Sequence, residues 1–221
     1  MVISLGTSGT AFISSPVPTH DATGEVAGFA DATGNFLPLA CTLNAAKIFD
    51  TTAKMLGMTF DEFSAAALSA PAGAQGLRLI PHFDGERTPN KPDATGSFYG
   101  ITHKNFTREN IARASIEGVM AGMRYASEAI GKLGVPINRI LIVGGAARNK
   151  AVQQISATLF EKEIHIPSPG EYVALGAAKQ AAWALSGKAE LPQWGGSSVE
   201  KVKSDSKFDK ALFDSYRELI K

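Results

Sequence analysis

The chain has 221 residues, of which 44% are hydrophobic and 19% are charged, a composition that excludes a disordered chain and a membrane-embedded protein. Its 22 basic and 21 acidic side chains leave a formal net charge of +1, which removes the global electrostatic case for nucleic acid or an anionic membrane as main partner. Any phosphate site must therefore be local, in a chain long enough for one large domain or two small ones.

The chain begins inside a predicted strand. Met1–Leu5 is apolar without a polar lead-in, and a second strand at 10–14 follows a Gly-Thr-Ser-Gly turn. Native domains rarely begin in this way, so we expect Met1 to be an initiator placed on an internal fragment of a longer protein. No charged leader with an apolar stretch opens the chain, and its single cysteine, Cys41, cannot form an internal disulfide, so we expect a cytoplasmic protein.

Apolar spacing predicts the remaining elements. Alternation of polar and apolar residues indicates strands, apolar residues three to four apart indicate helices, and Gly and Pro end most of these segments. The segment at 82–100 is rich in Gly, Pro, Asp and Asn, and we interpret it as an ordered, functional loop. We find no internal repeat and no boundary, and we predict a single domain over residues 1–221. The other expected elements are strands at 26–29, 36–39, 77–81, 139–143 and 164–166 and helices at 43–56, 60–68, 107–133, 149–160, 173–185 and 205–220.

Two glycine-rich turns are candidate ligand sites. Gly6–Thr10 offers backbone N–H groups and hydroxyls to an anion, because glycine permits the positive φ that turns successive amides inward. A plain hairpin turn of small residues is the alternative. Gly144–Ala146 closes a strand and precedes a helix, which suits the close approach of a ligand, although such turns also serve packing alone. The third glycine of the dinucleotide fingerprint is missing, so a nicotinamide cofactor is disfavoured.

A longer pattern carries a family resemblance. Gly96–Ile101, followed after eight residues by Asn110–Glu117, is similar, position by position, to the second sequence signature of the FGGY carbohydrate-kinase family. With the two glycine turns and the run at 174–178, the chain up to about Leu185 resembles the C-terminal half of these kinases. Asp84–Pro89 is similar to the xylulokinase branch of the family rather than to the glycerol-kinase branch.

The resemblance implies an α/β domain of the actin/Hsp70-type ATPase fold, with a ribonuclease-H-like mixed sheet of about five strands and helices on both faces. It also implies a two-domain sugar kinase that binds ATP and Mg²⁺ in the cleft between its halves. This chain would be the C-terminal, nucleotide-side half of an enzyme that converts D-xylulose to D-xylulose 5-phosphate. A stand-alone actin-like nucleotide-binding or interaction module stays open as the alternative. Oligomeric state is open too, with a homodimer as one outcome.

The same resemblance assigns nucleotide-binding residues. On the helix expected at 43–56, the resemblance assigns Ala46 and Asp50. Glycerol kinases carry Gly and Gln at these two positions, so this chain departs from them, and we do not assume hydrogen bonding from that helix to the base. Mg²⁺ would be held by ATP, water and a carboxylate or two. The assigned residues are Gly6 and Thr7 at the phosphates, Gly145, Ala146 and Asn149 at the adenosine, and Ala46 and Asp50 on that helix as another wall of the adenine pocket.

One part of the family's machinery is missing from the sequence. The family's general base is an aspartate in a short Asp-Asn or Asp-Gln motif upstream of the Gly-Thr-Ser loop, and this chain begins six residues before Thr7. We therefore assign no catalytic residue and expect the chain alone to be inactive. Its partner would be the missing N-terminal domain, which also holds the sugar. The four histidines have no ligand-like spacing, so no metal site is predicted.

Other polar residues have two interpretations each. The cluster of Asp84, Glu86 and Arg87 contacts the substrate or the partner domain, or it orders its own loop through salt bridges. We expect Glu117, which lies among apolar positions of a long helix, to be a structural hydrogen-bonding carboxylate. Arg148, beside the second glycine turn, contacts either the nucleotide or solvent.

Overall fold

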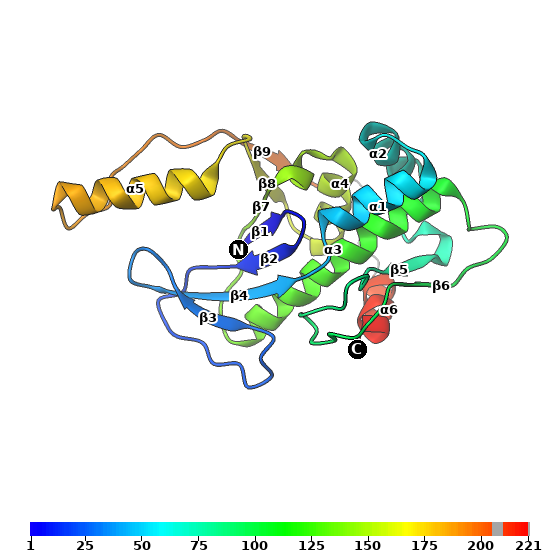
Figure 1. Cartoon of the computed structure of the whole chain (residues 1–221), viewed down its shortest axis with the longest axis horizontal. Coiled ribbons are helices and arrows are strands. Elements are labelled where there is room, and N and C mark those ends of the chain that lie inside the picture. Colours follow the sequence, from blue (N-terminus) through cyan, green and yellow to red (C-terminus); the bar gives the residue numbers. More distant parts are fainter. Residues whose placement is uncertain (205–209, 221) are drawn as a thin grey trace.

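The computed structural model describes residues 1–204 and 210–220, and a seven-stranded mixed sheet lies at its centre (Figure 1). Its strands are β1 (Val2–Leu5), β2 (Gly9–Phe12), β3 (Ala27–Ala30), β4 (Phe36–Thr42), β7 (Ile140–Val143), β8 (Ile164–Pro167) and β9 (Val199–Val202). The strand order is β3-β4-β2-β1-β7-β8-β9. The pairs β1–β7 and β7–β8 are parallel, and the other neighbours are antiparallel. This confirms the α/β class with a mixed sheet.

Strand pairing differs from the prediction in two places. The segment expected as a strand at 77–81 forms β5 (Arg78–Ile80), which pairs with β6 (Ser97–Tyr99) in a separate two-stranded ribbon. Neither β6 nor β9 was predicted. Each of the two is short and is stabilised by a partner distant in the chain, a relation that local apolar spacing does not report.

A long central helix, α3 (Arg108–Lys132), packs most of its residues into the core. It begins where the sequence predicts, because the Thr107 side chain accepts a hydrogen bond from the N–H of Asn110. α1 begins at Ala46, three residues later than predicted, since 43–45 form a turn. Residues 205–209 of the last predicted helix lie outside the described residues. The other helices are α1 (Ala46–Leu56), α2 (Phe60–Ser69), α4 (Lys150–Phe160), α5 (Tyr172–Ser186) and α6 (Lys210–Ile220), with 3₁₀ turns η1 (Ala74–Gly76) and η2 (Gly145–Arg148).

The two faces of the sheet are covered unequally. Ile3 and Ile142 are fully buried and belong to one hydrophobic core with residues of α1, α3 and α4. Val2 and Leu141 point to the opposite face, because side chains alternate along a strand, and they are only partly buried. α5 extends away from the body of the molecule in Figure 1 and buries none of its residues. Helices therefore cover the second face of the sheet less completely than the first.

Glu117 has the structural role that the sequence suggested. Its Oε1 accepts hydrogen bonds from the Nε of Arg113 at 2.7 Å and from the N–H of Gly73 at 2.9 Å. Burial raises the pKa of the Glu117 carboxyl, since the charged form loses its hydration, and the nearby Arg113 opposes that shift. The pair ties α3 to the segment that leads into η1. Within residues 1–204 and 210–220, no helix combines the length and apolar character needed to cross a bilayer.

Acidification should destabilise the protein through His82. This side chain is buried at the start of the 82–96 loop, and desolvation lowers its pKa below the ordinary value. The charge of Glu86 opposes that shift, and Lys91 adds a smaller lowering of the pKa. The folded protein then binds fewer protons than the unfolded chain, so stability is complete above about pH 6.5 and falls as the pH drops below it. Urea unfolding at pH 7.5 and 5.5 should show this loss, and His82→Gln should reduce it. An equal loss in the variant would contradict the assignment.

Candidate functional site

Four strands of the main sheet end at the same edge. β7 and β8 run parallel to β1, and β4 has the same direction because β2 is antiparallel to both β4 and β1. In open α/β sheets, ligands bind outside the carboxyl ends of the strands, where the connections leave in different directions. This edge is therefore the candidate site. The residues that end the four strands are Leu5, Thr42, Val143 and Pro167.

The turn after β1 is held by the start of α1. The N–H of Ala46 donates to the carbonyl of Gly6 at 2.9 Å, and the N–H of Ala45 donates to the carbonyl of Thr7 at 3.2 Å. In a trans peptide the N–H points opposite to the carbonyl, so the amides of Thr7 and Ser8 point away from α1. Gly6, Thr7 and Ser8 are all exposed. Two successive outward amides beside two hydroxyls are suited to binding an anion.

The second glycine turn lies beside the first because β1 and β7 are parallel neighbours. Gly144 has φ of 99°, which favours glycine, and a Cβ added to it would lie 2.5 Å from the carbonyl oxygen of Leu5. Its close approach to the end of β1 therefore requires glycine. Gly145 differs, because a Cβ added there meets no atom within 4 Å. Gly144 thus has a packing role, whereas Gly145 leaves open space at the site.

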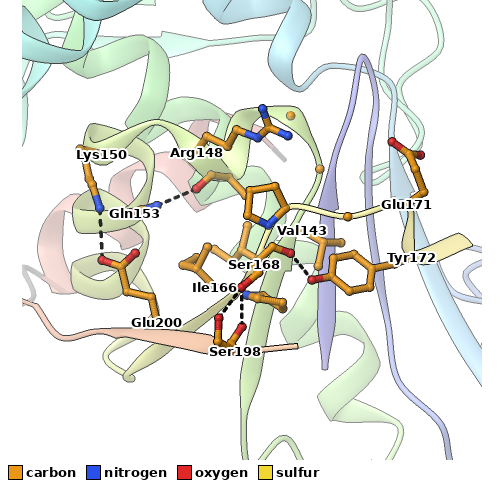
Figure 2. A pocket seen from close by; sticks show the side chains of 17 residues that line it. Val143, Arg148, Lys150, Gln153, Ile166, Ser168, Glu171, Tyr172, Ser198 and Glu200 are labelled. Atoms are coloured by element: carbon orange, nitrogen blue, oxygen red, sulfur yellow. Dashed lines mark hydrogen bonds and ion pairs between the residues drawn. The ribbon is translucent and has the colours of Figure 1, made fainter. Parts of the chain in front are cut away.

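A cavity of about 610 Å³ opens beside Gly145 (Figure 2). Its walls come from the β7–η2 turn and the start of α4, from the β8–α5 connection at 166–172, and from Ser198 and Glu200 at the start of β9. Cavities of this size hold cofactors and drug-sized ligands. Its lining is mixed, with apolar surface from Ile142, Ile166 and Pro169 and charged groups from Arg148, Lys150 and Glu171.

Polar contacts fix the walls of this cavity. Lys150 and Glu200 form an ion pair at 3.1 Å, and the Gln153 amide donates to the carbonyl of Ala147 at 2.8 Å. The N–H of Ser168 donates to the carbonyl of Ser198 at 2.9 Å, and the two hydroxyls of these serines also contact each other, which joins the β8–α5 connection to the start of β9 (Figure 2).

The structure brings the assigned residues together in two groups. Gly6 is joined to Ala46 and Thr7 to the preceding Ala45 by the hydrogen bonds described above, and Gly145 lines the cavity. The remaining three lie around these groups rather than in the cavity wall. Ala146 is buried behind the turn, the Asn149 side chain caps α4 by accepting from Val152 at 3.1 Å and from the Ser64 hydroxyl at 2.9 Å, and Asp50 is exposed one helical turn after Ala46.

Half of the cavity wall was missed by the sequence analysis. The β8–α5 connection contains Pro167 and Gly170, and a turn after a strand at this edge was a usable signal. No signal in the sequence pointed to Ser198 and Glu200, because they reach the cavity through the unpredicted strand β9. Arg148 lines the cavity and makes no ion pair within the described part of the chain. Among the described residues, no three His, Cys, Asp or Glu side chains are grouped so that they could hold a metal ion.

Comparison with known proteins gives consistent matches. The profile of the FGGY family of carbohydrate kinases, C-terminal domain, matches residues 1–185. The xylulose kinase of Streptomyces coelicolor is 40% identical over 188 residues, which cover 85% of this chain and 37% of that protein. The gluconokinase of Bacillus subtilis is 35% identical over 131 residues, covering 57% of this chain and 25% of that protein.

Solved structures agree. The crystal structure of xylulose kinase from Bifidobacterium adolescentis matches with a TM-score of 0.88 at 44% identity and covers 100% of this chain and 43% of that one. A Plasmodium falciparum glycerol kinase with ADP matches in fold, with a TM-score of 0.78 at 18% identity, over 98% of this chain and 45% of that one. The chain thus spans less than half the length of the relatives that it matches.

Proposed function

We propose, because the chain belongs to the FGGY family of carbohydrate kinases, that it is the C-terminal, nucleotide-side domain of an ATP-dependent sugar kinase. The complete enzyme would transfer the γ-phosphoryl group of ATP to the terminal hydroxyl of D-xylulose, giving D-xylulose 5-phosphate, in the cytoplasm. The xylulose kinases among its relatives support this choice of sugar. Residues 1–221 would form one domain of that enzyme.

The observation that carries the proposal is the meeting of two glycine turns at one sheet edge, beside a cavity. The turn at Gly6 displays the amides of Thr7 and Ser8, and the turn at Gly144 and Gly145 opens onto the cavity. Phosphoryl transfer depends mainly on positioning and on stabilising phosphate charge, so amide-lined turns on a rigid sheet suit it.

Each assigned residue has a proposed place at the nucleotide. Gly6 and Thr7 would contact the phosphates, and Gly145 would lie against the adenosine in the cavity. ATP would fit this edge because a Cβ at Gly145 would meet no atom within 4 Å and the cavity is large enough for a cofactor. The other four would act from behind or beside the nucleotide: Ala46 and Asp50 through the start of α1, and Ala146 and Asn149 by shaping the turn that leads into α4.

Magnesium would arrive with the nucleotide. The described residues offer no group of three metal-binding side chains, and Mg²⁺ commonly keeps several waters and is bound through substrate phosphates. We therefore derive no step from a protein-held metal.

The surface of the chain supports its proposed place in a larger enzyme. In α5, the side chains of Val173 and Leu185 are 89% and 90% exposed, and the second face of the sheet is only partly covered. These exposed apolar residues are accessible for contact with another domain. The missing N-terminal domain, with the sugar site and the general base, would be the partner.

ATP should bind weakly to the isolated chain and at this edge. In the proposed enzyme the cleft is shared by two domains, so the isolated chain would offer the ligand fewer contacts while the entropy loss on binding remains. In an NMR titration with ATP and Mg²⁺, we expect shifts confined to amides near Thr7 and Gly145. Gly145→Val should weaken binding by roughly tenfold or more, because the added side chain removes ligand contacts while the fold has room for it.

Gly176→Ala is the matched control for that variant. Gly176 also has open space around an added Cβ, but it lies on α5 outside the cavity, so ATP binding should not change. Tight binding of a nicotinamide cofactor with none of ATP, or equal ATP binding by Gly145→Val, would contradict the proposed site.

A further inference from the structure

Glu86 is a buried carboxylate, 3% exposed, that accepts three hydrogen bonds. Its Oε1 accepts from the N–H of Leu43 at 2.6 Å and from the N–H of Arg87 at 2.8 Å. Its Oε2 accepts from the side-chain amide of Asn44 at 3.0 Å, and the same amide donates to the carbonyl of Gly85 at 2.7 Å. Two of the three donors therefore belong to the turn that precedes α1, more than 40 residues away in the chain.

The segment at 43–46 also holds the loop after β1. The next two residues, Ala45 and Ala46, donate their backbone N–H groups to the carbonyls of Thr7 and Gly6. The Glu86 carboxylate is thus connected to the peptide groups of Gly6 and Thr7 through two sets of hydrogen bonds, which the backbone of residues 43–46 joins. The orientation of those carbonyls decides where the amides of Thr7 and Ser8 point.

The loop that carries Glu86 is closed by its own backbone. Glu86 and Lys91 exchange two backbone hydrogen bonds, both at 2.8 Å, and the N–H of Gly85 donates to the carbonyl of Ala94 at 3.1 Å. Gly85 has φ of 72°, and a Cβ added there would lie 2.1 Å from the carbonyl oxygen of Pro92. The carboxylate therefore lies on a loop that is held in one conformation by its own backbone hydrogen bonds.

We infer that Glu86 is a positioning residue that holds the Gly6–Thr7 loop with its amides directed at the phosphates of a bound nucleotide. This inference rests on the proposed function. The carboxylate would act without touching the nucleotide, because its hydrogen bonds are with Leu43, Asn44 and Arg87. The charged cluster at 84–87 acts in this way through Glu86, while Asp84 forms an exposed ion pair with Lys47 at 2.6 Å.

Glu86→Gln tests the inference with two measurements on the whole chain. The glutamine keeps one acceptor oxygen and directs an NH₂ group at a donor, so the turn at 43–46 loses part of its anchor. Native-state hydrogen exchange at the amides of Ala45 and Ala46 should accelerate on the order of tenfold, since hydrogen bonds to charged groups are strong. Affinity for ATP should fall by a similar factor, whereas affinity for adenosine, which has no phosphates, should not change.

Glu62→Gln is the matched control. The Glu62 carboxylate also accepts a backbone N–H, that of Thr59 at 2.7 Å, but it caps α2 far from the loop in sequence. This control should leave exchange at 45–46 and binding of both ligands unchanged. Asn44→Ser, which removes one donor to Glu86, should give a smaller effect of the same kind and serves if Glu86→Gln does not fold.

The remaining outcomes overturn the inference. Unchanged exchange at Ala45 and Ala46, or equal acceleration at all slowly exchanging amides, would show that Glu86 does not hold this loop in particular. Faster exchange with unchanged ATP affinity would remove the link to phosphate. If the unaltered chain binds no ATP, the proposed function and the phosphate part of the inference fail together, and exchange still decides whether Glu86 orients the loop.

Discussion

Replacing Arg113 with methionine should lower the free energy of unfolding by about 3–5 kcal/mol, because it leaves the carboxylate of Glu117 buried without its ion partner. Arg113 is 8% exposed and Glu117 is 1% exposed. The guanidinium also donates to the carbonyl of Ala70 at 3.0 Å, so its loss frees a second buried acceptor. Urea unfolding at pH 7 measures the change. The double variant Arg113→Met, Glu117→Met should lose less than the sum of the single variants, since no buried charge remains.

An exposed ion pair of the same spacing serves as a control, because it shows how much of the loss in stability is due to burial and how much to charge pairing alone. Lys210 and Asp214 are also four residues apart on one helix, and their side chains are 79% and 38% exposed. Solvent screens surface pairs of this kind, so Lys210→Met should have little effect. If Arg113→Met were equally mild, the buried pair could not be the tie between α3 and the segment before η1.

The parts of the fold that the sequence predicts well are those whose signal is local. α3 has a capping threonine and a long small-residue face, and Thr107 starts the helix as predicted. α1 begins late because Leu43 and Asn44 donate to the loop at 85–86 and the N–H of Ala45 donates to the carbonyl of Thr7. Apolar spacing does not report tertiary contacts of this kind. β6 and β9 were not predicted because each is stabilised by pairing with a strand distant in the chain. α5 was correctly expected as a helix, but its separation from the sheet is decided by packing that residues 172–186 alone cannot report.

The residues of the candidate site also differ in whether a local signal in the sequence marks them. The glycine turns at Gly6 and Gly144 could be found because glycine marks backbone positions that other residues adopt with strain, and parallel pairing of β1 with β7 brings them together. The far wall of the cavity could not be found in full, since Ser198 reaches it through an unpredicted strand. Asn149 shows a further limit, because the side chain assigned to the adenosine is engaged in capping α4.

The isolated chain should not phosphorylate xylulose, whereas the chain mixed with the N-terminal half of the same kinase should. A sugar hydroxyl is a poor nucleophile at neutral pH, and a positioned general base contributes about 10²–10⁴-fold. Closure of the cleft adds orientation of the reacting groups and excludes water. In the proposed enzyme both depend on the N-terminal half, so the increase on mixing should be at least of the size that a base contributes. A coupled assay of ADP formation with xylulose, ATP and Mg²⁺ measures it.

The carboxylates of this chain explain why activity without the other half is not expected. Glu86 lies near the proposed phosphate loop, but its oxygens already accept three hydrogen bonds from Leu43, Asn44 and Arg87, which direct the carboxylate at this chain's own donors rather than at a sugar hydroxyl. Asp84 is 68% exposed and paired with Lys47, so nothing orients it toward a sugar hydroxyl. Robust phosphorylation by the chain alone, abolished by Asp84→Asn, would show that this carboxylate is the base after all. Absence of activity from the mixture, with ATP bound normally, would instead favour a nucleotide-binding module without catalysis.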